Sequence, residues 1–245
     1  MVFRGFHKEI FDFLQGLYEH NDREWFESHK QTYETLVKPT AKALVVALAP
    51  FVKLMNEELE VRPRIHKTIS RIHNDLRFRK DRPPFKRYVF ITFPKEGRRW
   101  ADGPLLYLAI ERRGVWVGFW SGSHPRRVFQ KYWQSRLQQF GHLFQDYLER
   151  NRIITHYYLL LGNEEGPESE QLLTADLDFW RKLTEFSVGR FYPREDDLLY
   201  GSKFLEAVVH HFWDLYPFYI FQESGQVETE LQEYWEKKEM FRIVE

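Results

Sequence analysis

The sequence predicts an α+β fold, with helices in the N-terminal part, a mostly antiparallel sheet in the centre and helices again toward the C-terminus. Through residues 1–60, apolar residues recur at three- and four-residue spacing, which is the period of amphipathic helices. From residue 88 the pattern changes to short β-branched and aromatic runs bounded by Gly, Pro or Asp, which are typical of antiparallel strands.

No internal repeat, low-complexity tract or long linker divides the 245 residues. We therefore expect a single α+β domain over residues 1–245, with a helical part at 1–60 and a sheet-containing part at 61–245. Three helices are predicted in the first part. They cover 6–19, about 22–36 with Asn21 as N-cap, and a third segment whose first turn contains Pro39.

The remaining predicted elements include both strands and helices, according to the spacing of their apolar residues. The predicted strands are 88–94, 105–111 and 115–120, with a hairpin turn at 112–114 and a further candidate strand at 64–72. The later elements are a helix at 125–150, a strand at 153–161, an acidic loop at 162–171, a short helix at 175–183, a strand at 185–192, a helix at 203–221 closed by Pro217, and a terminal helix at 228–241.

Composition excludes several classes of protein. The chain has no cysteine, which rules out disulfides and Cys-ligated zinc or iron–sulfur sites. The longest apolar run, 43–52, is shorter than a bilayer-spanning helix, and no signal peptide opens the chain, so we expect a cytoplasmic protein without a membrane partner. The net charge is zero, but residues 62–99 hold 13 Lys and Arg against three Asp and Glu. Such sorted charge can attract an anion to one face.

The stretch 69–86 carries the candidate site. Pro83 and Pro84 fix the backbone and forbid a helix, so we expect a stiff, extended corner pinned to the core by Phe78 and Phe85. Guanidinium and ammonium groups bind phosphate and carboxylate, which predicts an anion pocket. The charged residues of the stretch are Arg71, Asp75, Arg77, Arg79, Lys80, Asp81, Arg82 and Lys86.

Two alternatives remain open at this point. Asp75 or Asp81 would serve as a general base or as a metal ligand if the protein is an enzyme that acts on an anionic substrate. The same residues would form only a network of ion pairs if the stretch is structural or the protein binds a partner elsewhere.

Two motifs carry a resemblance to a known family. The first is Asn-Asp-Arg-Glu-Trp-Phe at 21–26, and the second places Arg71, Asp75, Arg77, Phe78, Asp81, Pro84 and Lys86 in one pattern. Together with the segment 212–221, the two motifs resemble the family called domain of unknown function 2461. Asn74, Arg82 and Phe85 stand where that family usually has Arg, Lys and Tyr. The resemblance implies a bacterial-type soluble domain with no established activity.

The first motif lies at the predicted start of a helix, where backbone N–H groups and the helix dipole attract anions. If this helix end faces the stretch 69–86, the two motifs form one site, and Asn21, Arg23 and Trp25 join its ligand-binding residues. Our first hypothesis is a module that binds a phosphate-bearing ligand, either a small molecule or nucleic acid, with Trp100 available for stacking. The sequence specifies no cofactor, metal or oligomeric state.

Overall fold

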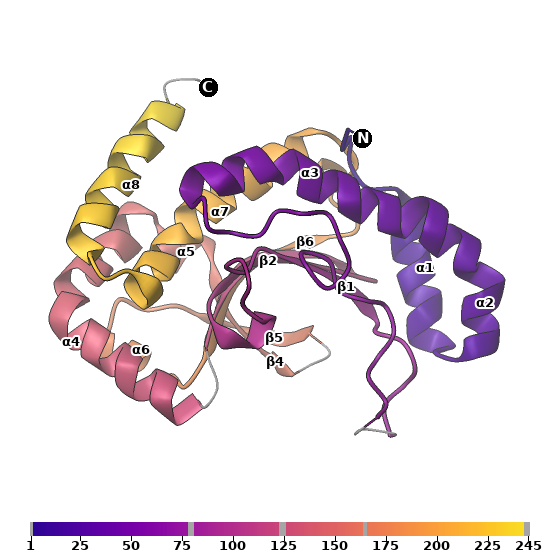
Figure 1. The fold of residues 1–245 in the computed structure, drawn as a ribbon, viewed down its shortest axis with the longest axis horizontal. Coiled ribbons are helices and arrows are strands. Elements are labelled where there is room, and N and C mark those ends of the chain that lie inside the picture. Colours follow the sequence, from indigo (N-terminus) through magenta and orange to yellow (C-terminus); the bar gives the residue numbers. More distant parts are fainter. Residues whose placement is uncertain (1, 78–80, 123–125, 164–165, 243–245) are drawn as a thin grey trace.

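The computed structural model describes residues 2–77, 81–122, 126–163 and 166–242 (Figure 1). Within these residues an antiparallel sheet of six strands has the order β1-β2-β3-β6-β4-β5. Its strands are β1 (Tyr88–Thr92), β2 (Leu105–Glu111), β3 (Gly114–Ser121), β4 (Tyr158–Asn163), β5 (Gly166–Leu172) and β6 (Phe186–Pro193).

Helices precede and follow the sheet, which confirms the predicted α+β class. They are α1 (Lys8–Glu19), α2 (Arg23–Thr32), α3 (Lys38–Met55), α4 (Arg126–Arg150), α5 (Ile153–His156), α6 (Leu177–Arg181), α7 (Lys203–Glu223) and α8 (Val227–Arg242). A π-helical segment, η1 (Tyr33–Val37), joins α2 to α3 without a break, and the 3-10 turns are η2 (Trp100–Asp102) and η3 (Asp197–Tyr200).

The main core lies between one face of the sheet and the helices α3 and α7, which run across that face in Figure 1. Strand residues alternate between the two faces. On β2 and β3 the core-facing set is Leu106, Leu108, Ile110, Val115, Val117 and Phe119. The opposite face carries a smaller cluster around Tyr107, Ala109, Trp116 and Leu160.

Helix α7 corrects one expectation. The sequence predicts that Pro217 closes this helix, but the helix continues to Glu223. Proline removes one backbone donor and costs a helix roughly 3 kcal/mol. Here Phe218, Ile220 and Phe221 are almost fully buried, and each such side chain contributes about 1.5–3 kcal/mol. Burial of the last turn therefore outweighs the lost hydrogen bond.

Other predictions also change. The helices expected at 22–36 and from Pro39 form one continuous helix, because Pro39 falls in a turn where its missing N–H is tolerated. The expected strand 64–72 forms only isolated pairings, and 153–161 divides into α5 and the start of β4. The predicted acidic loop 162–171 contains strand β5, which pairs with β4 at the end of the strand order. An edge strand tolerates charged residues.

The uninterrupted helix Arg23–Met55 is long and apolar enough to cross a membrane when judged by length and composition alone. Ala41, Leu44, Val45 and Leu48 of this helix are completely buried in the main core. Core helices of globular folds pass the same test, so this single helix is weak evidence for a membrane span.

Residues 69–77 and 81–86 form the two sides of an arm rather than a corner. Asn74 N–H donates to the Pro84 carbonyl at 2.9 Å, and Lys86 N–H donates to the Ile72 carbonyl at 2.7 Å. The base of the arm continues along the edge of β1, where Ser70 N–H donates to the Phe90 carbonyl at 2.8 Å. In Figure 1 the outer part of the arm projects away from the sheet, below α1 and α2.

Candidate functional site

The two sequence motifs lie against each other. The Asn21 side chain donates to the Phe85 carbonyl at 3.0 Å and accepts from the Phe85 N–H at 2.9 Å. Phe26 stacks on Phe85 with ring centroids 4.2 Å apart. The turn between α1 and α2 therefore holds the base of the arm through both backbone polar groups of Phe85 and through an aromatic stack.

Because its amide is used by the arm, Asn21 does not cap α2, and this part of the sequence prediction is wrong. The N-cap is Asp22, whose carboxylate accepts from the Trp25 N–H at 2.8 Å. Trp25 is half-buried and stacks on His29 at 4.0 Å, whereas Arg23 is exposed. None of Asn21, Arg23 and Trp25 lines a described cavity, so the first motif positions the arm.

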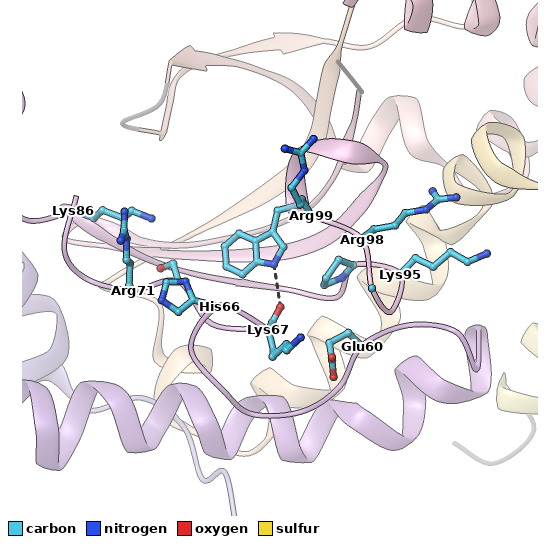
Figure 2. A pocket seen from close by; sticks show the side chains of 12 residues that line it. Glu60, His66, Lys67, Arg71, Lys86, Lys95, Arg98 and Arg99 are labelled. Atoms are coloured by element: carbon cyan, nitrogen blue, oxygen red, sulfur yellow. Dashed lines mark hydrogen bonds between the residues drawn. The ribbon is translucent and has the colours of Figure 1, made fainter. Parts of the chain in front are cut away.

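An open cavity of about 450 Å³ lies between the base of the arm, the segment 60–70 and the loop 94–100 (Figure 2). Its wall contains Ser70, His66 and Trp100, and, among the described residues, a single carboxylate, that of Glu60. The six Lys and Arg residues in the wall are Lys67, Arg71, Lys86, Lys95, Arg98 and Arg99.

The single carboxylate is already neutralised. Glu60 is 2% exposed and accepts from the Arg62 backbone N–H at 2.9 Å and from Arg62 Nε at 2.8 Å. The hydrogen bonds from Arg62, with the charge of Lys67 as a smaller cause, lower the pKa of Glu60 despite its burial. Glu60 therefore remains an anion paired with Arg62 and compensates little of the remaining cavity charge.

The cations at the end of the cavity away from the arm are also paired. In Figure 2, Lys95 and Arg98 point together away from the side where Arg71 and Lys86 lie. Lys95, Arg98 and Arg99 each have a carboxylate partner. The pairs are Lys95 with Glu58 at 2.6 Å, Arg98 with Glu223 at 2.5 Å, and Arg99 with Asp102 at 2.8 Å. This end of the cavity is rich in donors but close to electrically neutral.

The end at the base of the arm differs. Figure 2 shows Arg71 and Lys86 side by side there. The half-buried Lys86 has no carboxylate partner among the described residues, and its ammonium lies 6.0 Å from the centre of the Tyr88 ring. Burial, followed by the charges of Arg71 and Arg82, lowers the pKa of Lys86. The first cause reflects loss of water around the ammonium, and the second shows that like charge lies beside it.

Arg71 has only part of a counter-charge. Its guanidinium lies 3.3 Å from Asp75 Oδ2, but Arg77 binds the same carboxylate more closely, at 3.0 Å through Nε and at 2.7 Å through Nη2. Hydrogen bonds from Arg77, and more weakly from Arg71, hold the pKa of Asp75 far below its usual range. One carboxylate is thus shared between two guanidinium groups.

Trp100 forms a fixed aromatic part of the wall. It begins the turn η2, and its indole N–H donates to the Lys67 carbonyl at 3.0 Å, the dashed bond of Figure 2. The ring packs at 5.9 Å from Phe90 of β1. His66, which precedes Lys67 in the chain and also lines the cavity, has a φ of 67°, a left-handed backbone conformation that is uncommon outside glycine.

The structure separates the predicted site residues. Arg71 and Lys86 line the cavity, whereas Asp75, Asp81 and Arg82 do not. The Arg77 side chain is 77% exposed on the outer arm. The predicted Arg79, Lys80 and Phe78 lie outside the described residues.

Sequence reasoning missed Lys67, Lys95, Arg98 and Arg99 as members of the site. The excess of basic residues over 62–99 extends beyond the motif on both sides and is the signal that could have included them. Among the described residues no group of three His, Asp or Glu side chains could hold a metal ion.

A family model that describes a conserved hypothetical protein, DUF2461, matches residues 9–221. The chain belongs to the DUF2461 family. This confirms the resemblance seen in the sequence, and the matched region of this DUF2461 protein includes every residue that lines the cavity. No curated protein matches the chain.

Proposed function

We propose that this protein binds a phosphate-bearing anion in the cavity, with Arg71 and Lys86 as its principal ligands. The observation that supports this most directly is the half-buried ammonium of Lys86, which faces Arg71 and Arg82 and has no carboxylate partner among the described residues. A charge withdrawn from water is costly unless an opposite charge lies beside it. A bound anion supplies that charge.

The two side chains suit phosphate in complementary ways. Arginine offers a planar fork of donors that matches two oxygens of a phosphate, and lysine adds a compact point charge. Anion binding also raises the pKa of Lys86 back toward its ordinary value, because the anion favours the charged form. The paired cations at the other end of the cavity gain less from an anion, since each already has a carboxylate.

The geometry gives less support to acid–base chemistry by the two carboxylates of the arm. Neither Asp75 nor Asp81 lines the cavity. Asp75 is held ionised by Arg77 and Arg71, and a carboxylate with a depressed pKa is a weak general base. A purely structural role accounts for Asn21 and Phe85 but leaves the uncompensated charge at Lys86 unexplained.

Titration calorimetry at low salt with inorganic phosphate and with sulfate tests the proposal. We expect Lys86→Gln and Arg71→Gln each to weaken binding by about 10- to 100-fold, the usual range for a hydrogen bond to a charged group. Lys30→Gln is the matched control, because Lys30 is an exposed lysine paired with Glu27 on α2 and lies outside the cavity wall.

Wild-type binding should also weaken as salt is raised, because mobile ions screen the partly open site. The proposal fails if neither anion binds the wild-type protein at low salt. It also fails if Lys86→Gln binds phosphate as well as Lys30→Gln does.

A further inference from the structure

The cavity is several times larger than the anion that its charged end would hold. Its volume of about 450 Å³ lies in the range of sites for whole organic ligands, roughly 300–1,000 Å³. Arg71 and Lys86 occupy only the end at the base of the arm (Figure 2). If the proposed function is correct, the ligand therefore continues past its phosphate toward Trp100 and the loop 94–100.

The rest of the cavity wall indicates the chemistry of the part of the ligand that lies beyond the phosphate. Lys95, Arg98 and Arg99 are neutralised by their own carboxylates, so this end does not call for a second charged group. Trp100 instead offers an aromatic surface that is held in place by the hydrogen bond to the Lys67 carbonyl and by packing on Phe90. The complement is a planar, uncharged ring system.

Fixation of the indole matters for affinity. A ring held by a hydrogen bond loses little conformational freedom when a ligand stacks on it, so most of the stacking free energy is available for binding. Stacking of a nucleic acid base on an aromatic side chain is tolerant of base identity, because every base has a π face.

We propose that the cavity binds a nucleoside monophosphate unit, with its phosphate at Arg71 and Lys86 and its base against Trp100. This inference rests on the proposed function and names the class of ligand. The unit is the same chemistry whether it is a free nucleotide or the phosphorylated end of a single strand.

The test compares ligands that differ by one part. Calorimetry is run with inorganic phosphate, ribose 5-phosphate, adenosine, adenosine and uridine monophosphates, and a 5′-phosphorylated hexanucleotide. We expect each nucleoside monophosphate to bind about tenfold or more tightly than ribose 5-phosphate, since base stacking accounts for that difference. A tighter hexanucleotide identifies a strand as the source, and a tighter monophosphate identifies the free nucleotide.

Variants of the indole separate stacking from folding. Trp100→Leu should reduce monophosphate affinity to that of ribose 5-phosphate and leave phosphate affinity unchanged, and the retained phosphate binding shows that the cavity is intact. Trp100→Phe keeps an aromatic ring and should keep most of the gain. Trp235→Leu removes an indole from α8, outside the cavity wall, and is the control.

Several results overturn the inference while leaving the proposed function standing. They are a monophosphate that binds no tighter than ribose 5-phosphate, and a Trp100→Leu variant that weakens both ligands equally. If adenosine binds as tightly as its monophosphate, the assignment of the phosphate to Arg71 and Lys86 is wrong. If inorganic phosphate does not bind and Lys86→Gln changes nothing, the proposed function itself fails, and this inference with it.

Discussion

Lys86 at the base of the arm and Lys238 on α8 are two lysines withdrawn from solvent, and their surroundings are opposite. The Lys238 ammonium donates to Asp214 Oδ1 and to Asn151 Oδ1, both at 2.6 Å. Lys86 faces Arg71 and Arg82 and has no carboxylate partner among the described residues. The comparison separates a lysine charge that is compensated within the fold from one that has no carboxylate beside it among the described residues.

The paired region extends well beyond the lysine, in what we call the His211 network. Tyr157 donates to Asp214 Oδ2 at 2.8 Å, so its oxygen accepts from His211 Nδ1 at 2.7 Å. His211 Nε2 then accepts from Tyr192. A neutral imidazole with one N–H satisfies both contacts. Burial lowers the pKa of His211 to about 4, which keeps it neutral at physiological pH.

The difference between Lys238 and Lys86 distinguishes a buried charge with a structural role from one without a counter-charge. In the His211 network the polar groups of β6, α7, α8 and the segment around α5 satisfy one another, which is what a structural role requires. In the cavity the same type of side chain is left with an excess of like charge. The four predictions below test this contrast, from the largest expected effect to the smallest.

Asp214→Asn should have the largest effect. It leaves Lys238 buried without a carboxylate, and breaking a buried pair from one side costs about 3–5 kcal/mol of unfolding free energy. Urea denaturation measures this. The control is Asp146→Asn, which removes an exposed partner of Arg150 on α4 and should cost less than about 1 kcal/mol. A loss below about 1 kcal/mol for Asp214→Asn would show that the pair is not structural.

Mild acid should also weaken the network. The unfolded histidine has a pKa near 6.5 and the folded His211 about 4, so between these values the unfolded chain binds more protons. Stability should therefore fall as pH drops from about 6.5 toward 4, by roughly 3 kcal/mol over the whole window. Urea denaturation at pH 7, 6 and 5 measures the slope. His211→Gln should flatten it, and His210→Gln, its exposed neighbour, should not.

Lys86→Gln should change stability in the opposite direction from Lys238→Gln. Without ligand, removing Lys86 relieves repulsion from Arg71 and Arg82, and we expect the unfolding free energy to rise by roughly 0.5 kcal/mol. Lys238→Gln should lower it. Thermal unfolding in a chloride buffer, repeated with phosphate added, measures both. Phosphate should stabilise the wild type and Lys238→Gln but not Lys86→Gln, and destabilisation by Lys86→Gln without ligand would contradict the comparison.

Arg77→Ala should have the smallest effect. Arg77 is mostly exposed, and its ion pair with Asp75 is screened by water, so the unfolding free energy should hardly change. The carboxylate released by this change remains beside Arg71 and competes with a bound anion, so phosphate affinity should fall slightly. Calorimetry on this variant, beside Arg71→Gln, measures the difference. Loss of binding as complete as that of Arg71→Gln would place the site farther out on the arm.

The sequence was most informative where local pattern decides structure. Strand β2 has the predicted limits, 105–111, because β-branched and aromatic residues are bounded by Gly-Pro on one side and Arg-Arg-Gly on the other. Strand β5 was missed because its sequence has almost no strand-forming residues and depends on pairing with β4. Pro217 was misread because the packing that keeps α7 helical lies elsewhere in the chain.

The candidate site was predicted in part for a similar reason. Composition identifies 69–86 as basic and extended, and two of its residues, Arg71 and Lys86, line the cavity. Which side chains fall at the base of the arm and which at its outer end depends on strand register, which composition does not encode. The other side of the cavity comes from residues 94–100, and Trp100 reaches Lys67 across 33 positions of the chain.

The two hydrogen bonds between the Asn21 side chain and the Phe85 backbone bear on how the cavity is kept in shape. The turn after α1 fixes the backbone of Phe85, and Lys86 is the next residue in the chain. An aspartate of the same shape could accept from Phe85 N–H but could not donate to its carbonyl. On the proposed function, the affinity for an anion therefore depends partly on the Asn21 amide, which lies outside the cavity wall.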